Sequence, residues 1–217
     1  MSQTPTFGKS LRETSMVTAI RDQKYTLEEY FELERHSEKK WEFWDGDVWC
    51  MSGASPVHER IVVNAAGHLR ELLRGRGCSV FGSNLKVMVP DYEPYRYPDL
   101  TVLCGEGEYV TMAGLEVLTN PQMIIEVLSP STEPFDRRKK FTYYKSIPNF
   151  SEYLLIATDL PSITHYSKQE GEWVLSEALG AEVDIPIPTL NITMLASEIY
   201  LDIQFSDRKH DLSLVEK

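Results

Sequence analysis

Apolar residues recur with helical spacing in two segments of the first third of the chain. Residues 25–33 place aromatic and aliphatic side chains on one side, and acidic residues follow Thr26 in the way that is typical of a helix N-terminus. A longer helix is expected to begin at Ser55, because a proline stands at the first helical position and apolar residues follow with a period close to 3.6. This helix is expected to end near Gly75 or Gly77.

Most of the other apolar segments have the length and composition of β-strands. Two aromatic-rich runs within residues 41–51 flank Asp45-Gly46, a pair that favours the two-residue type I′ turn of a β-hairpin. The remaining expected strands are 78–81, 84–89, 99–104, 122–128, 152–157, 162–167 and 172–178, of which the last two form a hairpin. Residues 105–121 are expected to form a loop.

Together these elements predict one α/β or α+β domain, in which helices pack against a mixed sheet. The domain is expected to cover residues 25–205, because no Pro/Gly-rich linker and no internal repeat divides this part of the chain. The polar segments 1–24 and 206–217 are expected to be flexible tails.

Glu126 interrupts an otherwise apolar run, Met123 to Leu128, whose composition is typical of a strand in the centre of a sheet. Burying an ionised carboxylate costs several kcal/mol unless the carboxylate is paired, hydrogen-bonded or bound to a cation. Glu126 is therefore expected to be a metal ligand, or else to pair with an arginine or point to an open edge of the sheet.

A second carboxylate, Asp99, follows Pro98 at the start of another expected strand. If the strands that carry Asp99 and Glu126 are neighbours, the two side chains can converge on one Mg²⁺ ion. Magnesium is commonly held by one or two carboxylates, with water and substrate phosphate completing its coordination.

The segment after the Glu126 strand predicts a short helix that Pro148 limits. Asp136, Lys140 and Tyr144 recur every four residues and therefore share one face of this helix. Lys140 could reach back to the two carboxylates, or it could belong to a solvated basic face.

The charge of the chain restricts how it could bind nucleic acid. Its 217 residues carry a formal net charge of -11, so the protein repels polyanions on average, and a protein that merely coats nucleic acid is not expected. Contact with nucleic acid would need divalent cations or a local basic patch. The best candidate patch is formed by Arg137, Arg138 and Lys139.

The three cysteines, Cys50, Cys78 and Cys104, are an odd number without CxxC spacing, which argues against a disulfide framework and against a zinc cage. A reducing cytoplasm is the expected location. The first twenty residues lack the apolar core of a signal peptide, and no stretch has the roughly 20 apolar residues of a membrane span. Secretion and membrane insertion are therefore not expected.

Three motifs occur here in a combination that is quite specific. They are the YPD sequence ending at Asp99, the EVLSPST sequence beginning at Glu126, and the spacing of Asp136, Lys140 and Tyr144. The combination resembles the Uma-two family, a family of proteins described as endonucleases in the PD-(D/E)XK superfamily. The resemblance covers roughly residues 25 to 200.

The resemblance implies a restriction-endonuclease-like fold and an activity that hydrolyses phosphodiester bonds in DNA. It also implies that Asp99 and Glu126 are ligands of Mg²⁺ or Mn²⁺. The superfamily motif would place a lysine at the position of Leu128. The resemblance instead implies Lys140 as a displaced catalytic lysine. Such cores often act as homodimers, so a homodimer is also expected.

Four further residues complete the predicted site. The resemblance implies Glu42 as a third acidic residue near the metal ion, although Glu42 could simply lie on the polar face of a hairpin. His58 could support the site or could be a structural histidine, and Asp136 and Tyr144 are expected to support the site. The alternative function is an interaction module with the same fold and a weak or inactive site.

Overall fold

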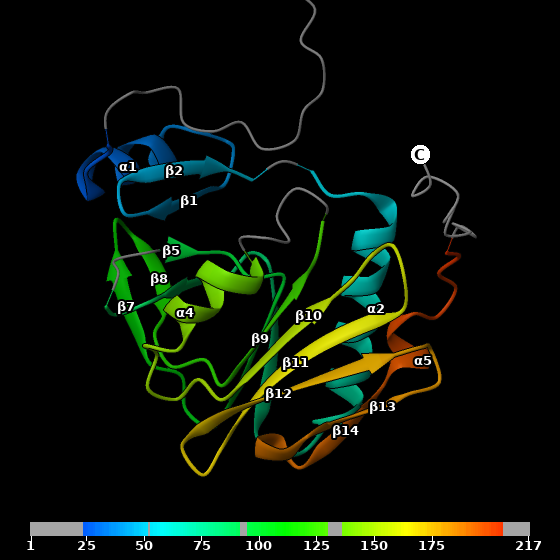
Figure 1. Cartoon of the computed structure of the whole chain (residues 1–217). Helices are drawn as coiled ribbons and strands as arrows, with labels where there is room; N and C mark the ends of the chain where they lie inside the picture. Colours follow the sequence, from blue (N-terminus) through cyan, green and yellow to red (C-terminus); the bar gives the residue numbers. More distant parts are fainter. Residues whose placement is uncertain (1–23, 52, 92–94, 130–135, 206–217) are drawn as a thin grey trace, which may run out of the picture.

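The computed structural model describes residues 24–51, 53–91, 95–129 and 136–205, and Figure 1 shows the course of the chain. The predicted tails, 1–24 and 206–217, lie outside the described residues except for Lys24. The described part has the expected mixed α+β architecture and forms a single domain.

A six-stranded mixed sheet forms the centre of the fold, with the strand order β12-β11-β10-β9-β6-β3. Strands β9 and β10 are parallel, and all other neighbours in this sheet are antiparallel. The strands are β3 (Cys78–Gly82), β6 (Leu100–Cys104), β9 (Met123–Val127), β10 (Glu152–Ile156), β11 (Ser162–Gln169) and β12 (Glu172–Leu179). The prediction that the Glu126 strand lies inside the sheet is therefore confirmed.

A second six-stranded sheet, with the order β2-β1-β5-β4-β8-β7, was not expected from the sequence. Its strands are β1 (Trp41–Trp44), β2 (Asp47–Cys50), β4 (Lys86–Met88), β5 (Tyr95–Arg96), β7 (Tyr109–Met112) and β8 (Leu115–Leu118). The prediction of a loop over residues 105–121 is wrong, because β7 and β8 form an antiparallel hairpin there. Its turn residues, Ala113 and Gly114, have φ of 51° and 84°, and an Ala-Gly pair is not a usual signal for a turn of this kind.

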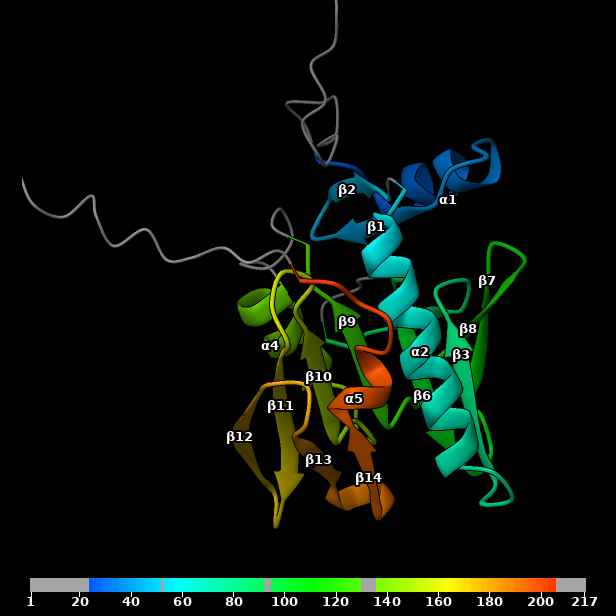
Figure 2. The ribbon, with the colours of Figure 1, turned by 90° about the vertical axis from the view of Figure 1, so that its right-hand side faces the viewer.

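Helical segments cover both faces of the central sheet (Figures 1 and 2). Helix α2 (Pro56–Leu72) buries Ile61, Ala65 and Leu69 against alternate residues of the sheet. The opposite face packs against the continuous segment formed by the π-helical turn η1 (Asp136–Lys140) and helix α4 (Phe141–Tyr144). The remaining elements are α1 (Leu27–Arg35), β13 (Asp184–Ile187), the 3-10 turn η2 (Pro188–Leu190), β14 (Ile192–Leu195) and α5 (Ala196–Ile199).

Local sequence signals explain the boundaries of several elements. Thr26 caps α1 with a reciprocal hydrogen-bond pair to Glu29, and Ser55 caps α2 by accepting the His58 N–H. Asp45 and Gly46 have φ of 41° and 78°, as a type I′ turn between β1 and β2 requires. These predictions are confirmed.

A disulfide joins Cys78 of β3 to Cys104 of β6, so the prediction that the cysteines are unpaired is wrong for these two. The two residues face each other directly in the antiparallel ladder, although 26 positions separate them in the chain. An odd number of cysteines cannot reveal such a pairing, because the pairing depends on strand register. Cys50 is free, and the cysteine count no longer argues for a reducing compartment.

Among the described residues, no helix combines the length and the apolar composition needed to cross a membrane.

Candidate active site

Asp99 and Glu126 face each other across two neighbouring strands. Leu100 of β6 pairs with Ile125 of β9, so Asp99, one residue before Leu100, stands opposite Glu126. Directly opposite residues project from the same face of a sheet. The sequence-based condition for convergence, that the two strands be neighbours, is therefore met.

Glu126 lies on the face of the central sheet that η1 and α4 cover, and one side chain from each of these two segments contacts it. The Lys140 Nζ lies 3.1 Å from Glu126 Oε1, and the Tyr144 hydroxyl donates a hydrogen bond of 3.0 Å to the same oxygen. Burial raises the pKa of the Glu126 carboxyl to about 8, and neighbouring carboxylates add to the rise while Lys140 opposes it. Of the two alternatives for Lys140, the structure shows the one in which it reaches back to the Glu126 strand.

Asp136 fixes Lys140 from the other side. Its Oδ1 lies 2.9 Å from the Lys140 Nζ, four residues along the chain, and both side chains are buried. Burial disfavours the charged form of Lys140, but the carboxylates of Asp136, Glu126 and Glu42 outweigh it and raise the lysine pKa well above its ordinary value. Lys140 is thus a buried, charged ammonium group between the carboxyl groups of Asp136 and Glu126.

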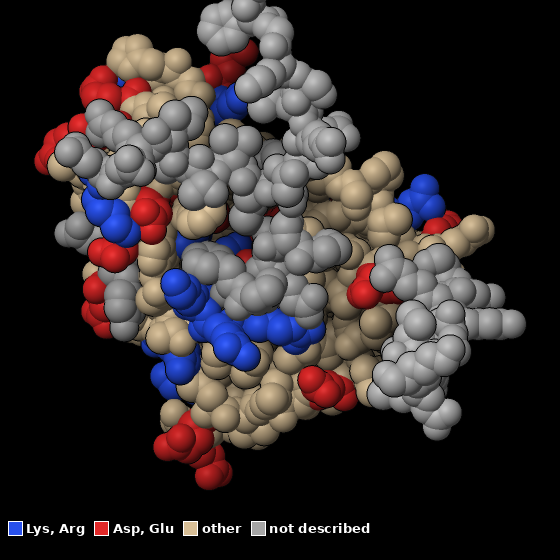
Figure 3. All heavy atoms as spheres, turned by 45° about the horizontal axis from the view of Figure 1, so that its top comes forward, with Lys and Arg blue, Asp and Glu red and all other residues tan. Residues whose placement is uncertain are grey.

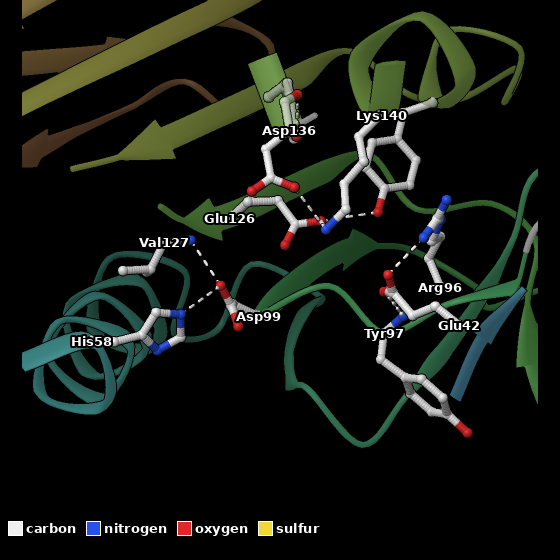
Figure 4. Close-up of polar contacts among 11 residues, drawn as sticks. Glu42, His58, Arg96, Tyr97, Asp99, Glu126, Val127, Asp136 and Lys140 are labelled. Carbon is white, nitrogen blue, oxygen red and sulfur yellow. Dashed lines mark hydrogen bonds and ion pairs between the residues drawn. The ribbon is translucent and has the colours of Figure 1, made fainter. Parts of the chain in front are cut away.

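Asp99 is positioned by the N-terminal turn of α2 and by the backbone of β9. Its Oδ2 accepts a hydrogen bond of 2.7 Å from the Val127 N–H, and His58 Nε2 lies 3.3 Å from the same oxygen. Burial lowers the pKa of His58, but hydrogen bonding and charge attraction to Asp99 outweigh it, so the pKa is raised overall. Figure 4 shows His58, Asp99 and Val127 on the side of the site that adjoins α2.

Glu42 is held by Arg96. The Arg96 guanidinium donates to Glu42 Oε2 at 2.6 Å, and the Tyr97 N–H donates to Oε1 at 3.1 Å. Burial disfavours ionisation of Glu42, but Lys140 and Arg96 outweigh it and lower the pKa of Glu42. Both oxygens of Glu42 are therefore engaged by the chain, and its role as a third metal ligand stays a prediction.

One pocket of about 760 Å³ connects these groups. Six of the predicted site residues line it: Glu42, His58, Asp99, Glu126, Asp136 and Lys140. Tyr144 reaches the site through its hydrogen bond to Glu126. The structure thus brings the predicted catalytic and supporting residues to one place, and Figure 4 shows their side chains converging from different elements.

The donor set fits a hard divalent cation that is bound partly by solvent or substrate. Among the described residues, no hydrogen bond or ion pair engages Asp99 Oδ1 or Glu126 Oε2, so each carboxylate keeps one oxygen for a cation. No group of three or more His, Cys, Asp or Glu side chains in this part of the chain is arranged to hold a metal ion. A pair of carboxylates is nevertheless sufficient for Mg²⁺ when water and phosphate supply the other ligands.

The predicted basic patch is partly available on the surface. Arg138 and Lys139 of η1 are exposed, whereas Arg137 is half-buried and donates a hydrogen bond of 2.8 Å to the Thr164 hydroxyl. Figure 3 shows Lys and Arg side chains gathered in the middle of one face, with most acidic side chains towards its periphery. Such a distribution lets an acidic protein attract phosphate locally.

Sequence reasoning missed several residues of the pocket. Arg96, which holds Glu42, lies three positions before Asp99, and only the pairing of β1 with β5 brings it to Glu42. Lys39, Lys40 and Trp49 line the same pocket from the β1–β2 end. The alternation of polar and aromatic residues in β1 and β2 was visible in the sequence, but the side of the hairpin that faces the site was not.

Comparison with known proteins gives consistent matches. Residues 27–197 match the Uma2 family, described as "Putative restriction endonuclease". Two uncharacterized Synechocystis proteins are similar to this chain. The protein sll1609 is 33% identical over 168 residues, and the match covers 77% of this chain and 94% of sll1609. The protein slr1290 is 29% identical over 183 residues, and the match covers 84% of this chain and 94% of slr1290. The crystal structure of a putative nuclease belonging to DUF820 from Anabaena variabilis has the same fold, with a TM-score of 0.63, 18% identity and coverage of 81% of this chain and 97% of that one.

Proposed function

Because the chain belongs to the Uma2 family, described as putative restriction endonucleases, we propose that it hydrolyses phosphodiester bonds in DNA with Mg²⁺ or Mn²⁺ bound by Asp99 and Glu126. The observation that carries this proposal is the pair of opposed carboxylates with one free oxygen each, beside the buried ammonium group of Lys140. The fixed ammonium group of Lys140, together with a metal ion bound by the two carboxylates, would stabilise a substrate group that becomes more negative during the reaction.

Each residue has a role that follows from its contacts. Asp99 and Glu126 would hold the divalent cation, which when bound polarises the scissile phosphate and makes water more acidic. The Lys140 ammonium group, fixed by Asp136, would stabilise negative charge on the phosphate or orient the attacking water. His58 and the Val127 N–H keep Asp99 aimed at the pocket, and Tyr144 does the same for Glu126.

The charges that line the pocket support a requirement for a divalent cation in the binding of DNA. The described lining of the pocket includes six carboxylates, Glu38, Glu42, Glu59, Asp99, Glu126 and Asp136, and only three lysines. A DNA phosphate would be repelled from such a pocket unless a divalent cation offset part of the negative charge. Arg138 and Lys139 would then contact phosphates outside the pocket. Homodimer formation and a cytoplasmic location stay predictions.

The test is nicking of supercoiled plasmid by purified protein in Mg²⁺ and in Mn²⁺, with EDTA as the metal-free condition. We expect Asp99→Asn and Glu126→Gln each to reduce the nicking rate by about 100-fold or more, because each removes a negatively charged ligand. Glu116→Gln is the matched control, since Glu116 is an exposed carboxylate on β8. Thermal melting of every variant would verify that it folds.

Two results would count against the proposal. Nicking that persists in EDTA or in folded Glu126→Gln would exclude the proposed site. Retention of DNA without metal and without cleavage in any condition would favour the alternative function, an interaction module with the same fold.

A further inference from the structure

Trp49 is an aromatic side chain placed beside the acidic centre. It pairs directly with Glu42 in the β1–β2 ladder, so both side chains project from the same face of the hairpin. Glu42 and Trp49 accordingly line the same pocket, and Trp49 is half-buried. The indole thus forms part of the pocket wall, directly across the hairpin from Glu42 of the candidate active site.

The other three tryptophans lie outside the pocket lining. Trp44 is buried, and the Arg96 guanidinium carbon lies 4.8 Å from its ring centroid. Trp173 packs against Phe141 and Phe150 on the central sheet. The Trp41 Nε1–H donates a hydrogen bond to Ser37. None of these three is among the described residues that line the pocket, so Trp49 differs from them in its location.

The pocket wall around Trp49 combines apolar and basic groups. Cys50, Met51 and Ala54 line the pocket close to Trp49 in the sequence, and Lys39 and Lys40 line it from the segment before β1. Lys39 is exposed, whereas the Lys40 Nζ donates a hydrogen bond of 3.0 Å to the Ser83 carbonyl. One pocket therefore contains a carboxylate pair for a cation, an aromatic and apolar wall, and lysines that can attract phosphate.

We propose that Trp49 is a stacking platform for an unpaired nucleobase, so that the substrate of the site is single-stranded or locally unpaired DNA. The inference rests on the proposed function, whose scissile phosphate would lie at Asp99 and Glu126. An indole stacks on any base, and aromatic platforms of this kind are a common means of binding single strands. A base within an intact duplex is stacked and paired, and it cannot enter a pocket without being extruded.

The size and charge of the pocket agree with this ligand. A volume of about 760 Å³ lies within the range of pockets that hold small molecules, so it has room for a nucleotide and its metal-bound phosphate. The acidic centre would repel a phosphate without a cation, whereas the wall at Trp49 contacts a neutral base. The acidic and the aromatic parts of the pocket lining therefore complement the two chemically different parts of one nucleotide.

The test measures binding of a fluorescein-labelled single-stranded 12-nucleotide DNA by anisotropy, with Ca²⁺ in place of Mg²⁺ to limit cleavage. We expect Trp49→Ala to weaken binding roughly tenfold or more, as removal of a stacking aromatic does elsewhere. Trp49→Phe should retain most of the affinity, since phenylalanine also offers an aromatic face. The corresponding blunt duplex should bind the wild-type protein more weakly than the single strand.

A thermodynamic cycle separates stacking from a structural role of Trp49. Oligonucleotides in which one base at a time is replaced by an abasic site should bind the wild-type protein more weakly at one position. The same replacement should have little further effect on Trp49→Ala, because the stacking partner is already absent. A merely structural tryptophan would instead give losses that add.

The outcomes distinguish this inference from the proposed function. Equal affinity of wild type and folded Trp49→Ala for the single strand would overturn the stacking inference, even if metal-dependent nicking is found. Duplex binding as tight as single-strand binding would also overturn it. A positive abasic-site cycle, with neither the plasmid nor the single strand cleaved in Mg²⁺ or in Mn²⁺, would leave the stacking site standing and reject the nuclease.

Discussion

Lys139 and Lys140 are adjacent in the sequence and occupy opposite environments. Lys140 is buried between Glu126 and Asp136, whereas Lys139 is exposed on the surface. The wide turn of η1 carries both of them. Two neighbouring lysines can therefore have different functions, one inside the candidate site and one on the surface that we propose contacts DNA.

This difference predicts contrasting variants. Lys140→Met should reduce the nicking rate by about 100-fold or more, because it removes the fixed positive charge beside the proposed metal ligand. It should also lower the free energy of unfolding by about 3 kcal/mol, because Asp136 and Glu126 lose their buried partner. Single-turnover cleavage and urea unfolding measure the two effects.

Lys139→Met is the matched control for Lys140→Met. It should unfold like the wild type and should reduce the dependence of DNA affinity on salt by about one phosphate contact. Equal nicking rates for the two variants would contradict the assignment of Lys140 to the site.

Among the elements, the β7–β8 hairpin shows how strand pairing can override a weak local turn signal. Ala113 has a φ of 51°, although left-handed backbone costs alanine roughly 1 kcal/mol or more. Strand β8 pairs with β4 and buries Val117 and Leu118 completely. The favourable free energy of this burial offsets the unfavourable turn residue, and the hairpin forms without an Asn-Gly sequence.

Ala113→Asn is expected to stabilise the protein by about 1 kcal/mol, because asparagine adopts positive φ more readily than alanine in a type I′ turn. The measurement is urea unfolding, in which the midpoint should rise while the dependence of the unfolding free energy on urea concentration stays unchanged. Asp45→Ala, which places alanine in the corresponding position of the β1–β2 turn, should shift the midpoint in the opposite direction. A lower midpoint for Ala113→Asn would show that its side chain meets an obstacle.

At the scale of the whole molecule, the disulfide ties an edge strand to the inside of the central sheet. Strand β3 is the last strand of this sheet, and Cys78 joins it to Cys104 of β6. The strand that carries Asp99 therefore has a covalent connection to its neighbour at the end away from the carboxylate. The cross-link should support the fold more than it affects the chemistry of the site.

Reduction of the disulfide is expected to lower the free energy of unfolding by about 3 kcal/mol, because the bond closes a loop of 26 residues in the unfolded chain. Urea unfolding with and without dithiothreitol measures this loss, and Cys78→Ala with Cys104→Ala should reproduce it. Cys50→Ser is the control, since Cys50 is free. Identical midpoints in oxidising and reducing conditions would contradict the expectation.

The sequence by itself determined the local elements and the identity of most site residues. Caps, the Asp45-Gly46 turn and apolar periodicity depend on near neighbours, so α1, α2 and the β1–β2 hairpin could be predicted. Glu126 could be singled out because a carboxylate in an apolar strand needs a partner wherever that strand lies. The resemblance to a known family then added the catalytic role of Lys140 and the place of Glu42 near the metal ion.

Only the tertiary structure decided which residues meet. The second sheet, the Cys78–Cys104 bond and the Arg96–Glu42 pair all depend on strand order and register across long stretches of chain. Register also determined that Trp49 lies on the side of its hairpin that faces the pocket. Local sequence patterns do not contain this information, because pairing between distant strands is selected by the packing of the whole core.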